Sequence, residues 1–391
     1  MTEKEILEQA KGIFPKLQKL RRKIHSNPEL SFVEFETCKF IQNELSELGI
    51  ESKVIGNTGV VATIGKGNQC VGLRADIDAL PIKEETGLEF ASLNEGVMHA
   101  CGHDMHTTML IGAAEILKKN EDSLGGIVKL IFQPGEEKLP GGASILIEEG
   151  VLENPKVDAI FGQHIYPGES EGTISLNSGP VMGAPDELYF TIKGTSTHAA
   201  QPHLGHDPIL AASQLIVHFQ TLMTKYKDPI EAGVLSITSI KGGNSTNIIP
   251  DDVKLMGTLR SFNEQWRTEM HRLIEVNSKA VCELYGCEIE IEIKKGYPPV
   301  VNDEKITELT INNAINLVGE DNTKVFEPKM WGEDFAFYGK NIPATFWFVG
   351  VRPKNLKTMP ALHNSKLSPS ENAMPIGTAM LVTAAMNYLK G

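Results

Sequence analysis

The sequence predicts an α/β fold, with a mostly parallel sheet covered by helices and a smaller α+β domain inserted into it. Three observations support this prediction. Short apolar runs alternate with helical segments up to about residue 162, the pattern changes over residues 186–295, and the alternation returns from Tyr297 onward. Strands that alternate with helices are typical of a parallel sheet. A chain of 391 residues is long enough for two or three domains.

The elements of the first part follow from the spacing of apolar residues. These residues recur at helical spacing from residue 5 to about residue 48, with a break at Ser26-Asn27-Pro28, which predicts two helices. The segments expected next are strands at 60–64 and 70–77, a helix at 107–118, a strand ending at Gln133, a helix at 143–149 and a strand at 157–162.

The middle of the chain follows a different order. Leu188, Phe190 and Ile192 alternate along a predicted strand, and Asp207-Pro208 supplies an N-cap followed by a proline at the first helical position. The segments expected next are strands at 234–240 and 253–260, a helix with an apolar stripe from Trp266 to Leu284, and a strictly alternating strand at 287–294. This β-α-β-β-α-β order is the ferredoxin-like unit.

The domain boundaries follow from this change of pattern. Residues 186–295 are interpreted as the inserted domain, and residues 1–185 and 296–391 as one discontinuous larger domain. The larger domain is expected to end with a strand at 344–350 and a helix at 371–389.

Composition excludes several classes of partner. The formal net charge of −13 leaves no basic surface for phosphate groups, so neither nucleic acid nor an anionic membrane is an expected partner. The five cysteines include no Cys-x-x-Cys pair, which favours a reducing, cytoplasmic location. The N-terminal segment predicts an amphipathic helix instead of a signal peptide, and no apolar run approaches the length of a membrane span.

One segment, His99-Ala-Cys101-Gly-His103-Asp104-Met-His106, combines a thiol and three imidazoles within eight residues. The acidic pair Glu136-Glu137 follows a predicted strand, and His164 and His363 lie at the ends of apolar runs. Thiolate, imidazole and carboxylate groups are the ligands that transition metals take in hydrolases. Strand ends are also where open α/β sheets place their sites. A surface loop beside a buried free cysteine is the alternative for this segment if it is considered alone.

The carboxylates near this segment suggest further roles. In a two-metal hydrolase, one residue of a pair such as Glu136-Glu137 can bind an ion while its neighbour takes a proton from water. A solvated turn is the alternative for the pair. Arg74, Asp76 and Asp78 end another predicted strand, where one carboxylate could orient a ligand imidazole. A salt-bridged strand terminus is an equal alternative for these three residues.

The ordered motifs of the chain resemble those of a known enzyme family. This is the dinuclear metallopeptidase and amidohydrolase family of aminoacylase, hippurate hydrolase, plant indole-acetyl-amino-acid hydrolases and glutamate-releasing carboxypeptidases, in its Cys-Gly-His branch. The motifs in order are Arg22-Lys-Ile-His25 with Pro28-Glu29-Leu30, Leu73-Arg-Ala-Asp-Ile-Asp-Ala-Leu-Pro81, His99-Ala-Cys-Gly-His-Asp104, Phe132-Gln-Pro-Gly-Glu-Glu137, Thr197-His198 with Pro202-His203, Asn247-Ile-Ile-Pro250, Gly332-Glu-Asp-Phe335 and Leu362-His363.

The resemblance implies two divalent metal ions, of zinc, manganese, cobalt or nickel, and a general base, Glu136. It implies that Asp78 supports a ligand. The ligands that it implies are Cys101, His103, Glu137, His164 and His363. The wider family has a histidine where this chain has Asp76 and bridges its ions with an aspartate, so Cys101 is expected to take the bridging role here.

The resemblance also gives the inserted domain a function as a lid and dimerisation domain. It implies a homodimer or higher homo-oligomer in which His198 reaches the neighbouring subunit's site and stabilises an oxyanion. Arg260 is expected to bind the carboxylate of the substrate, and Asn247 to add a polar contact. The segments Gly194-Thr-Ser-Thr-His198 and Met330-Trp331 depart from the family pattern, which bears on the shape of the acyl pocket.

The sequence therefore predicts a metal-dependent amidohydrolase. The expected substrates are N-acyl amino acids, with an acetyl, benzoyl or similar group, or short peptides, which are cleaved to release a free amino acid. A carboxypeptidase or dipeptidase with peptide preference is one alternative, and a catalytically silent binding protein on the same fold is another. A phosphodiesterase would need several basic residues near the ions, and the motifs supply essentially only Arg74.

Overall fold

The computed structural model describes residues 1–390 and divides into two compact units. The large unit comprises Met1–Val181, Val301–Glu327 and the chain from Asp334 onward. The small unit comprises Met182–Val300 and Pro328–Glu333. Each unit has its own cluster of buried apolar side chains.

The large unit is built on an eight-stranded sheet. Its central pairs β4–β3, β3–β5 and β5–β16 are parallel, so the predicted α/β class with a mostly parallel sheet is confirmed. All seven residues of β3 are buried, which is typical of a strand covered on both faces. The strands in spatial order are β1 (Ser52–Ile55), β2 (Gly59–Gly65), β4 (Ile127–Gln133), β3 (Cys70–Asp76), β5 (Ala159–Ser170), β16 (Ala344–Arg352), β6 (Ile174–Leu176) and β15 (Thr323–Val325).

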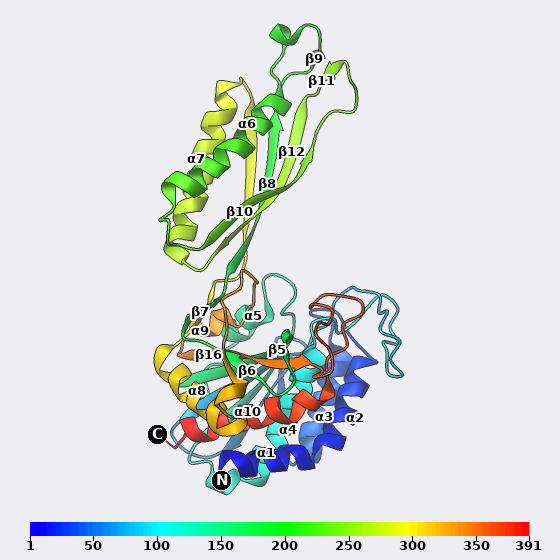
Figure 1. Ribbon diagram of the computed structural model, residues 1–391, viewed down its shortest axis with the longest axis vertical. Coiled ribbons are helices and arrows are strands. Elements are labelled where there is room, and N and C mark those ends of the chain that lie inside the picture. Colours follow the sequence, from blue (N-terminus) through cyan, green and yellow to red (C-terminus); the bar gives the residue numbers. More distant parts are fainter. Residues whose placement is uncertain (391) are drawn as a thin grey trace. The chain divides into compact units, whose positions relative to one another are not determined.

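Helices cover both faces of this sheet. Figure 1 shows α4 and α10 on one side of it and α5 and α9 on the other. Helices α1 and α2 pack against α4 and α10 instead of directly on the sheet. The helices of the large unit are α1 (Glu3–Gly12), α2 (Phe14–His25), α3 (Phe35–Glu47), α4 (His103–Lys119), α5 (Gly142–Glu148), α8 (Glu304–Val318), α9 (Ala336–Gly339) and α10 (Met374–Tyr388).

Two helix boundaries differ from those that the apolar spacing predicted. A boundary at Ile13 separates α1 from α2, because Pro15, in the first turn of α2, has no N–H to continue the preceding helix. Helix α4 begins at His103, four residues before the predicted start, because Gly102 adopts a left-handed conformation with φ of 84°. Helix α8 has no counterpart among the predicted elements.

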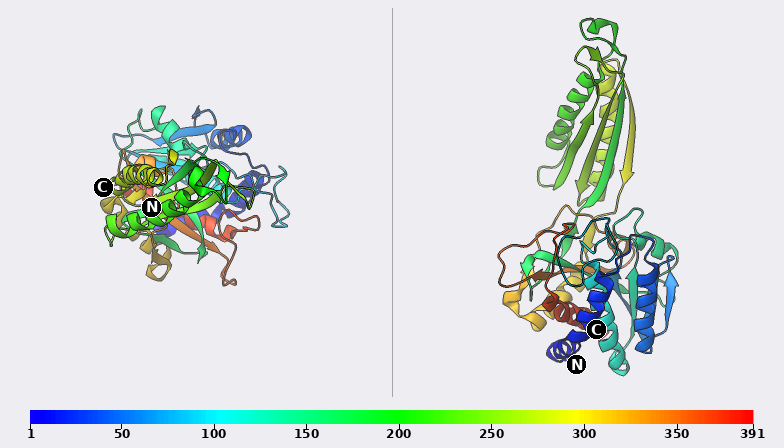
Figure 2. Two further views of the ribbon diagram at one scale, coloured as in Figure 1. Left: turned by 90° about the horizontal axis from the view of Figure 1, so that it is seen from above. Right: turned by 90° about the vertical axis from the view of Figure 1, so that its right-hand side faces the viewer.

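The small unit has the β-α-β-β-α-β order expected for a ferredoxin-like fold. Its four strands pair antiparallel in the order β10-β12-β8-β13. In the right-hand view of Figure 2, both helices of the unit lie on one face of this sheet. Asp207 caps α6 by accepting from the N–H groups of Ile209 and Leu210. The elements are β8 (Ala184–Lys193), α6 (Pro208–Thr221), β10 (Gly233–Lys241), β12 (Asp252–Ser261), α7 (Glu264–Leu284) and β13 (Glu288–Lys295).

Four short strands form two further small sheets. Strand β9 (Thr197–His198) pairs with β11 (Ile248–Ile249), and β7 (Gly179–Met182) pairs with β14 (Val300–Asn302).

Candidate metal centre

The candidate ligands gather at one edge of the large sheet. Strands β3, β4 and β5 run parallel, so the residues that follow β3 and β4 meet at the same edge. Asp78 follows β3, Glu136 and Glu137 follow β4, and His164 lies within β5. This is the edge at which open α/β sheets place their sites.

A tight turn at Gly102 brings Cys101 and His103 to this edge. The positive φ of Gly102 places one residue on each side of the turn, and His103 is the first residue of α4. A Cβ atom at Gly102 would lie 2.2 Å from Cδ1 of the buried Ile165. The turn therefore needs glycine, because the conformation and the close approach both exclude a side chain.

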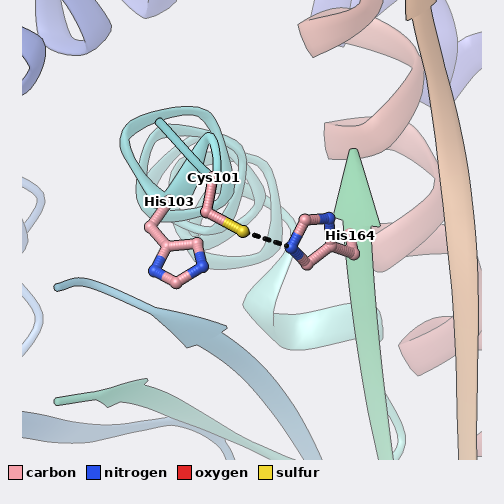
Figure 3. A group of neighbouring side chains, drawn as sticks. All are labelled: Cys101, His103 and His164. Atoms are coloured by element: carbon pink, nitrogen blue, oxygen red, sulfur yellow. Dashed lines mark hydrogen bonds between the residues drawn. The ribbon is translucent and has the colours of Figure 1, made fainter. Parts of the chain in front are cut away.

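The first candidate ligand triplet consists of Cys101, His103 and His164, all of which are buried. Their ligand atoms lie within 4.8 Å of one another. Figure 3 shows the thiol of Cys101 directed at the His164 ring, with Sγ 3.3 Å from Nε2. The His164 Nδ1 lies 2.7 Å from the Ile165 carbonyl oxygen. Since a carbonyl only accepts, Nδ1 carries the proton and Nε2 keeps its lone pair for a ligand.

The second candidate ligand triplet consists of Cys101, Glu137 and His363, again within 4.8 Å. Glu137 Oε1 lies 3.0 Å from His363 Nε2 and 4.0 Å from His103 Nε2. His363 has φ of 63° and is the most exposed of the three, with 52% of its side chain accessible. Cys101 belongs to both triplets.

Asp78 orients one of these imidazoles. Its Oδ1 lies 3.2 Å from Nδ1 of His103, and its Oδ2 accepts from the Glu137 N–H at 3.0 Å and from the Ser31 hydroxyl at 2.6 Å. Because the carboxylate accepts from Nδ1, the Nε2 atom of His103 faces the other candidate ligands. Sequence reasoning did not find Ser31, which lies 47 residues from Asp78 along the chain.

The donor set fits divalent metal ions. Among residues 1–390, His103 Nε2 is one of the buried side-chain atoms without a hydrogen-bond partner. Buried polar atoms normally find a partner, so an unpartnered imidazole nitrogen that faces a thiol and a carboxylate indicates an occupant that is not a side chain. One thiol, three imidazoles and one carboxylate, from Cys101, His103, His164, His363 and Glu137, match the ligand preferences of zinc and of the related transition metals.

The electrostatics of the cluster support a cation. Burial, together with the negative charges of Glu137 and Glu136, raises the pKa of the Cys101 thiol well above its usual value. Burial disfavours a charged His103, but the carboxylates of Asp76 and Asp78 outweigh it and raise its pKa to about 10. Both groups therefore hold protons in the absence of a cation, and a divalent ion would displace them.

At the end of β3, the structure has both arrangements that the sequence allowed, a carboxylate that orients a candidate ligand and a salt-bridged strand terminus. Asp78 contacts a candidate ligand, whereas Arg74 and Asp76 form a buried ion pair in which Nη1 lies 2.8 Å from Oδ2. Asp76 also lies 2.6 Å from His106 through Oδ1 and Nδ1. Sequence reasoning assigned no role to His106, although its position three residues after His103 on one helix was a usable indication.

A buried carboxylate, Asp334, clamps the loop that carries Glu136 and Glu137. Its oxygens accept from Gln133 Nε2 at 2.8 and 2.9 Å, just before the loop, and from the Ala143 N–H at 2.9 Å, just after it. Arg74 Nη2 donates to the same carboxylate at 2.8 Å. The loop is therefore tied at both ends to the strand that leads to Asp78.

The remaining predicted site residues lie in the small unit. His198 and Asn247 lie next to each other, because β9 and β11 pair and the Ala199 N–H donates to the Asn247 carbonyl oxygen at 3.0 Å. Both side chains are exposed. Arg260, on β12, is half-buried, and its Nε donates to the Thr258 hydroxyl at 3.0 Å.

The helices of the described residues include none that is both long enough and apolar enough to cross a membrane.

The chain is clearly similar to known proteins. The model of Peptidase family M20/M25/M40 matches residues 72–387. The N-acetyl-L-cysteine deacetylase of Bacillus subtilis (strain 168) is 42% identical over 337 residues, which cover 85% of this chain and 79% of that protein.

Two further matches span almost the whole chain. The IAA-amino acid hydrolase ILR1-like 4 of Arabidopsis thaliana is 39% identical over 376 residues, which cover 95% of this chain and 85% of that protein. The crystal structure of the Bacillus subtilis YXEP protein, a dinuclear metal binding peptidase from the M20 family, matches with a TM-score of 0.84 and 35% identity. That match covers 97% of this chain and 99% of the other.

These matches confirm the resemblance inferred from the motifs. Metal-dependent hydrolysis of amide bonds, as predicted from the sequence, is the activity of this enzyme. The chain belongs to Peptidase family M20/M25/M40.

Proposed function

We propose that this enzyme hydrolyses the amide bond of N-acyl amino acids and releases the free amino acid. The observation that carries the proposal is the convergence of Cys101, His103, His164, Glu137 and His363 at one sheet edge, beside Glu136. Two of the similar proteins support this substrate class, since one is named for an N-acetyl amino acid and the other for IAA-amino acids.

Two divalent ions would be held by the two triplets, with Cys101 as their shared ligand. A thiolate favours zinc, and a site with a carboxylate and imidazoles also suits manganese, cobalt or nickel. When bound, such ions supply Lewis acidity, which polarises a carbonyl group and makes water easier to deprotonate.

Glu136 is the general base of the proposal. It is 6% exposed, and its carboxylate lies within 4.8 Å of the ligand atoms of His103 and Glu137. The side chain is therefore close enough to the ligands to take a proton from water and later to give it to the leaving amine. Asp78 keeps His103 oriented during both steps through its contact with Nδ1.

The small unit would supply the groups that recognise the substrate. Arg260 offers a planar guanidinium suited to a carboxylate, Asn247 an amide, and His198 an imidazole that donates to the developing oxyanion. We propose that His198 acts on the site of a second subunit in a homodimer or higher homo-oligomer, and that the enzyme works in the cytoplasm. Crosslinking and sedimentation of the intact chain test the oligomeric state.

A substrate panel tests the proposal. Metal-stripped enzyme is reloaded with zinc, manganese, cobalt or nickel and assayed on N-acetyl, N-benzoyl and indole-acetyl amino acids and on dipeptides. We expect kcat/KM to be highest for an N-acyl amino acid and activity to disappear on chelation. Higher kcat/KM for dipeptides would instead support a peptidase, and an ion-loaded protein that turns over no amide would support a silent binding protein.

A further inference from the structure

We propose that His106 is a positioning residue that holds His164 in the orientation needed to bind a divalent ion. The inference rests on the proposed function, because it assumes that His164 is a ligand. His106 is completely buried on α4, beside the His164 ring, with the two ring centroids 4.4 Å apart and the ring planes at 68° to each other.

The hydrogen bonds around His106 leave only one arrangement of its protons. Its Nδ1 lies 2.6 Å from Oδ1 of Asp76, and its Nε2 lies 2.9 Å from the backbone nitrogen of Ile165. The Ile165 N–H can only donate, so Nε2 is the acceptor and Nδ1 carries the proton that is donated to Asp76. The two contacts together fix both the tautomer and the rotation of the ring.

The backbone of the same residue, Ile165, also fixes His164. The Ile165 N–H donates to His106, and the carbonyl oxygen of Ile165 accepts from Nδ1 of His164 at 2.7 Å. The Ile165 residue is thus held from both sides, by an imidazole on α4 and by the imidazole that it orients. The Nε2 atom of His164 is left with a lone pair directed at the Cys101 thiol, 3.3 Å from Sγ.

Asp76 anchors this series of contacts to the centre of the sheet. Its second oxygen, Oδ2, accepts from Arg74 Nη1 at 2.8 Å, and its backbone carbonyl accepts from the Thr107 hydroxyl at 3.1 Å. Asp76, His106 and Ile165 are all fully buried, so water is poorly placed to replace a lost contact. Removing the His106 ring would leave the Ile165 N–H without an acceptor and loosen the residue whose carbonyl oxygen orients His164.

Three variants separate positioning from general packing. His106→Leu removes both contacts of the ring. His106→Gln keeps an amide oxygen that can accept from the Ile165 N–H, so it is the conservative rescue. Thr107→Val is the matched control, because it removes a buried hydrogen bond to the same residue, Asp76, from the neighbouring position of the same helix.

The experiment measures metal binding on the whole chain. Metal-free protein is titrated with zinc against a chromophoric chelator, and cobalt is then bound so that the thiolate and imidazole ligands can be followed by absorption. We expect His106→Leu to bind one ion about 10- to 100-fold more weakly, with altered cobalt bands. We expect His106→Gln to recover most of that loss, and Thr107→Val to bind both ions as the wild type does.

The outcomes distinguish this inference from the proposed function. Wild-type affinity for both ions in His106→Leu would overturn the positioning role, and so would an equal loss in Thr107→Val. A wild-type protein that binds no pair of ions would overturn the proposed function itself. Melting curves of the metal-free variants report folding. If His106→Leu does not fold, a Thr107→Val protein that binds zinc as weakly as His106→Gln, or more weakly, would overturn the inference.

Discussion

Two adjacent carboxylates at the end of β4 differ in their surroundings. Glu137 Oε1 lies close to two imidazoles, those of His363 and His103, and its backbone N–H is bound by Asp78. Glu136 is more deeply buried than Glu137. One of its carboxylate oxygens lies within 4.8 Å of a ring nitrogen of His103 and of a carboxylate oxygen of Glu137. These surroundings favour metal binding by Glu137 and proton transfer by Glu136.

Replacing Glu136 tests this division of roles. Glu136→Gln keeps the shape of the side chain but cannot take a proton, so we expect kcat to fall by roughly 10²- to 10⁴-fold while both ions stay bound. Glu137→Gln is the comparison, and it should lose metal. Turnover measured beside metal analysis gives both quantities, and a Glu136→Gln enzyme with wild-type kcat would contradict the assignment of the base.

A buried histidine outside the metal centre makes stability depend on pH. Nδ1 of His25 lies 2.9 Å from Asp104 and Nε2 lies 3.2 Å from Glu84. Burial opposes the charge on His25, but these carboxylates outweigh it and raise the pKa to about 9. Because the pKa of His25 is higher in the folded protein than its ordinary value of 6.5, the charged ring stabilises the folded state fully below about pH 6.5. This stabilisation is lost as the pH rises through about 9.

The expected result is a decrease in the melting temperature of the metal-free protein between about pH 7 and pH 10. His25→Gln removes one of the titrating groups and should make that part of the profile less steep, while the contribution of His103, whose pKa is also raised, remains. Parallel slopes for the two proteins in calorimetric scans would show that His25 does not cause the pH dependence.

At the scale of elements, the turn before α4 determines where two candidate ligands lie. Gly102→Ala would place a methyl group 2.2 Å from Ile165 Cδ1, in a conformation that costs a non-glycine residue roughly 1–2 kcal/mol. Gly87→Ala is the matched control, since Gly87 has φ of 71° but no atom within 4 Å of such a methyl group. We expect both variants to be destabilised, and only Gly102→Ala to lose affinity for zinc. Equal zinc affinity in the two variants would show that the turn does not position the ligands.

Elements defined by local chemistry could be predicted from the sequence. Asp207-Pro208 predicted the start of α6, and the structure has Asp207 as its N-cap with Pro208 as the first helical residue. The strand ends with charged residues were also visible, because apolar runs stop there. The early start of α4 was not, because it depends on the conformation of Gly102 and on its contact with Ile165, a residue far along the chain.

Contacts between distant residues explain what the sequence could not show about the site. Arg74 and Asp334 are 260 residues apart, and Ser31 and Asp78 are 47 apart, yet each pair is in contact. Both contacts depend on which strands become neighbours in the sheet and on how the intervening segments fold back. No spacing rule for helices or strands connects such positions, so nothing in the sequence indicated Ser31, and Asp334 belonged to a motif, Gly332-Glu-Asp-Phe335, that indicated no partner for it.

At the scale of the whole molecule, the two units have separate cores and different sources of stability. All five candidate ligands lie in the large unit, so zinc should stabilise that unit by about 2.7 kcal/mol when the free zinc concentration is 100 times the dissociation constant.

In the small unit, the buried Asp186 accepts from Arg267 Nε at 2.9 Å, His271 Nε2 at 2.6 Å and the Gly296 N–H at 3.0 Å.

Calorimetry should therefore separate the two units. A chelator is expected to lower the melting transition of the large unit alone. Asp186→Asn should lower that of the small unit alone, by an amount of the order of the roughly 3–5 kcal/mol lost when a buried ion pair is broken. A single transition that responds equally to the chelator and to the substitution would show that the two units unfold together.

The position of β16 affects how the chain can fold during synthesis. This strand lies between β5 and β6 in the large sheet, but Ala344–Arg352 is translated after the whole of Met182–Val300. The ribosome therefore releases most of the small unit while β5 still has an unpaired edge, and unpaired edges tend to aggregate. Between translation of residue 170 and translation of residue 352, the nascent chain therefore carries an uncovered strand edge that only its own distant C-terminal part can pair.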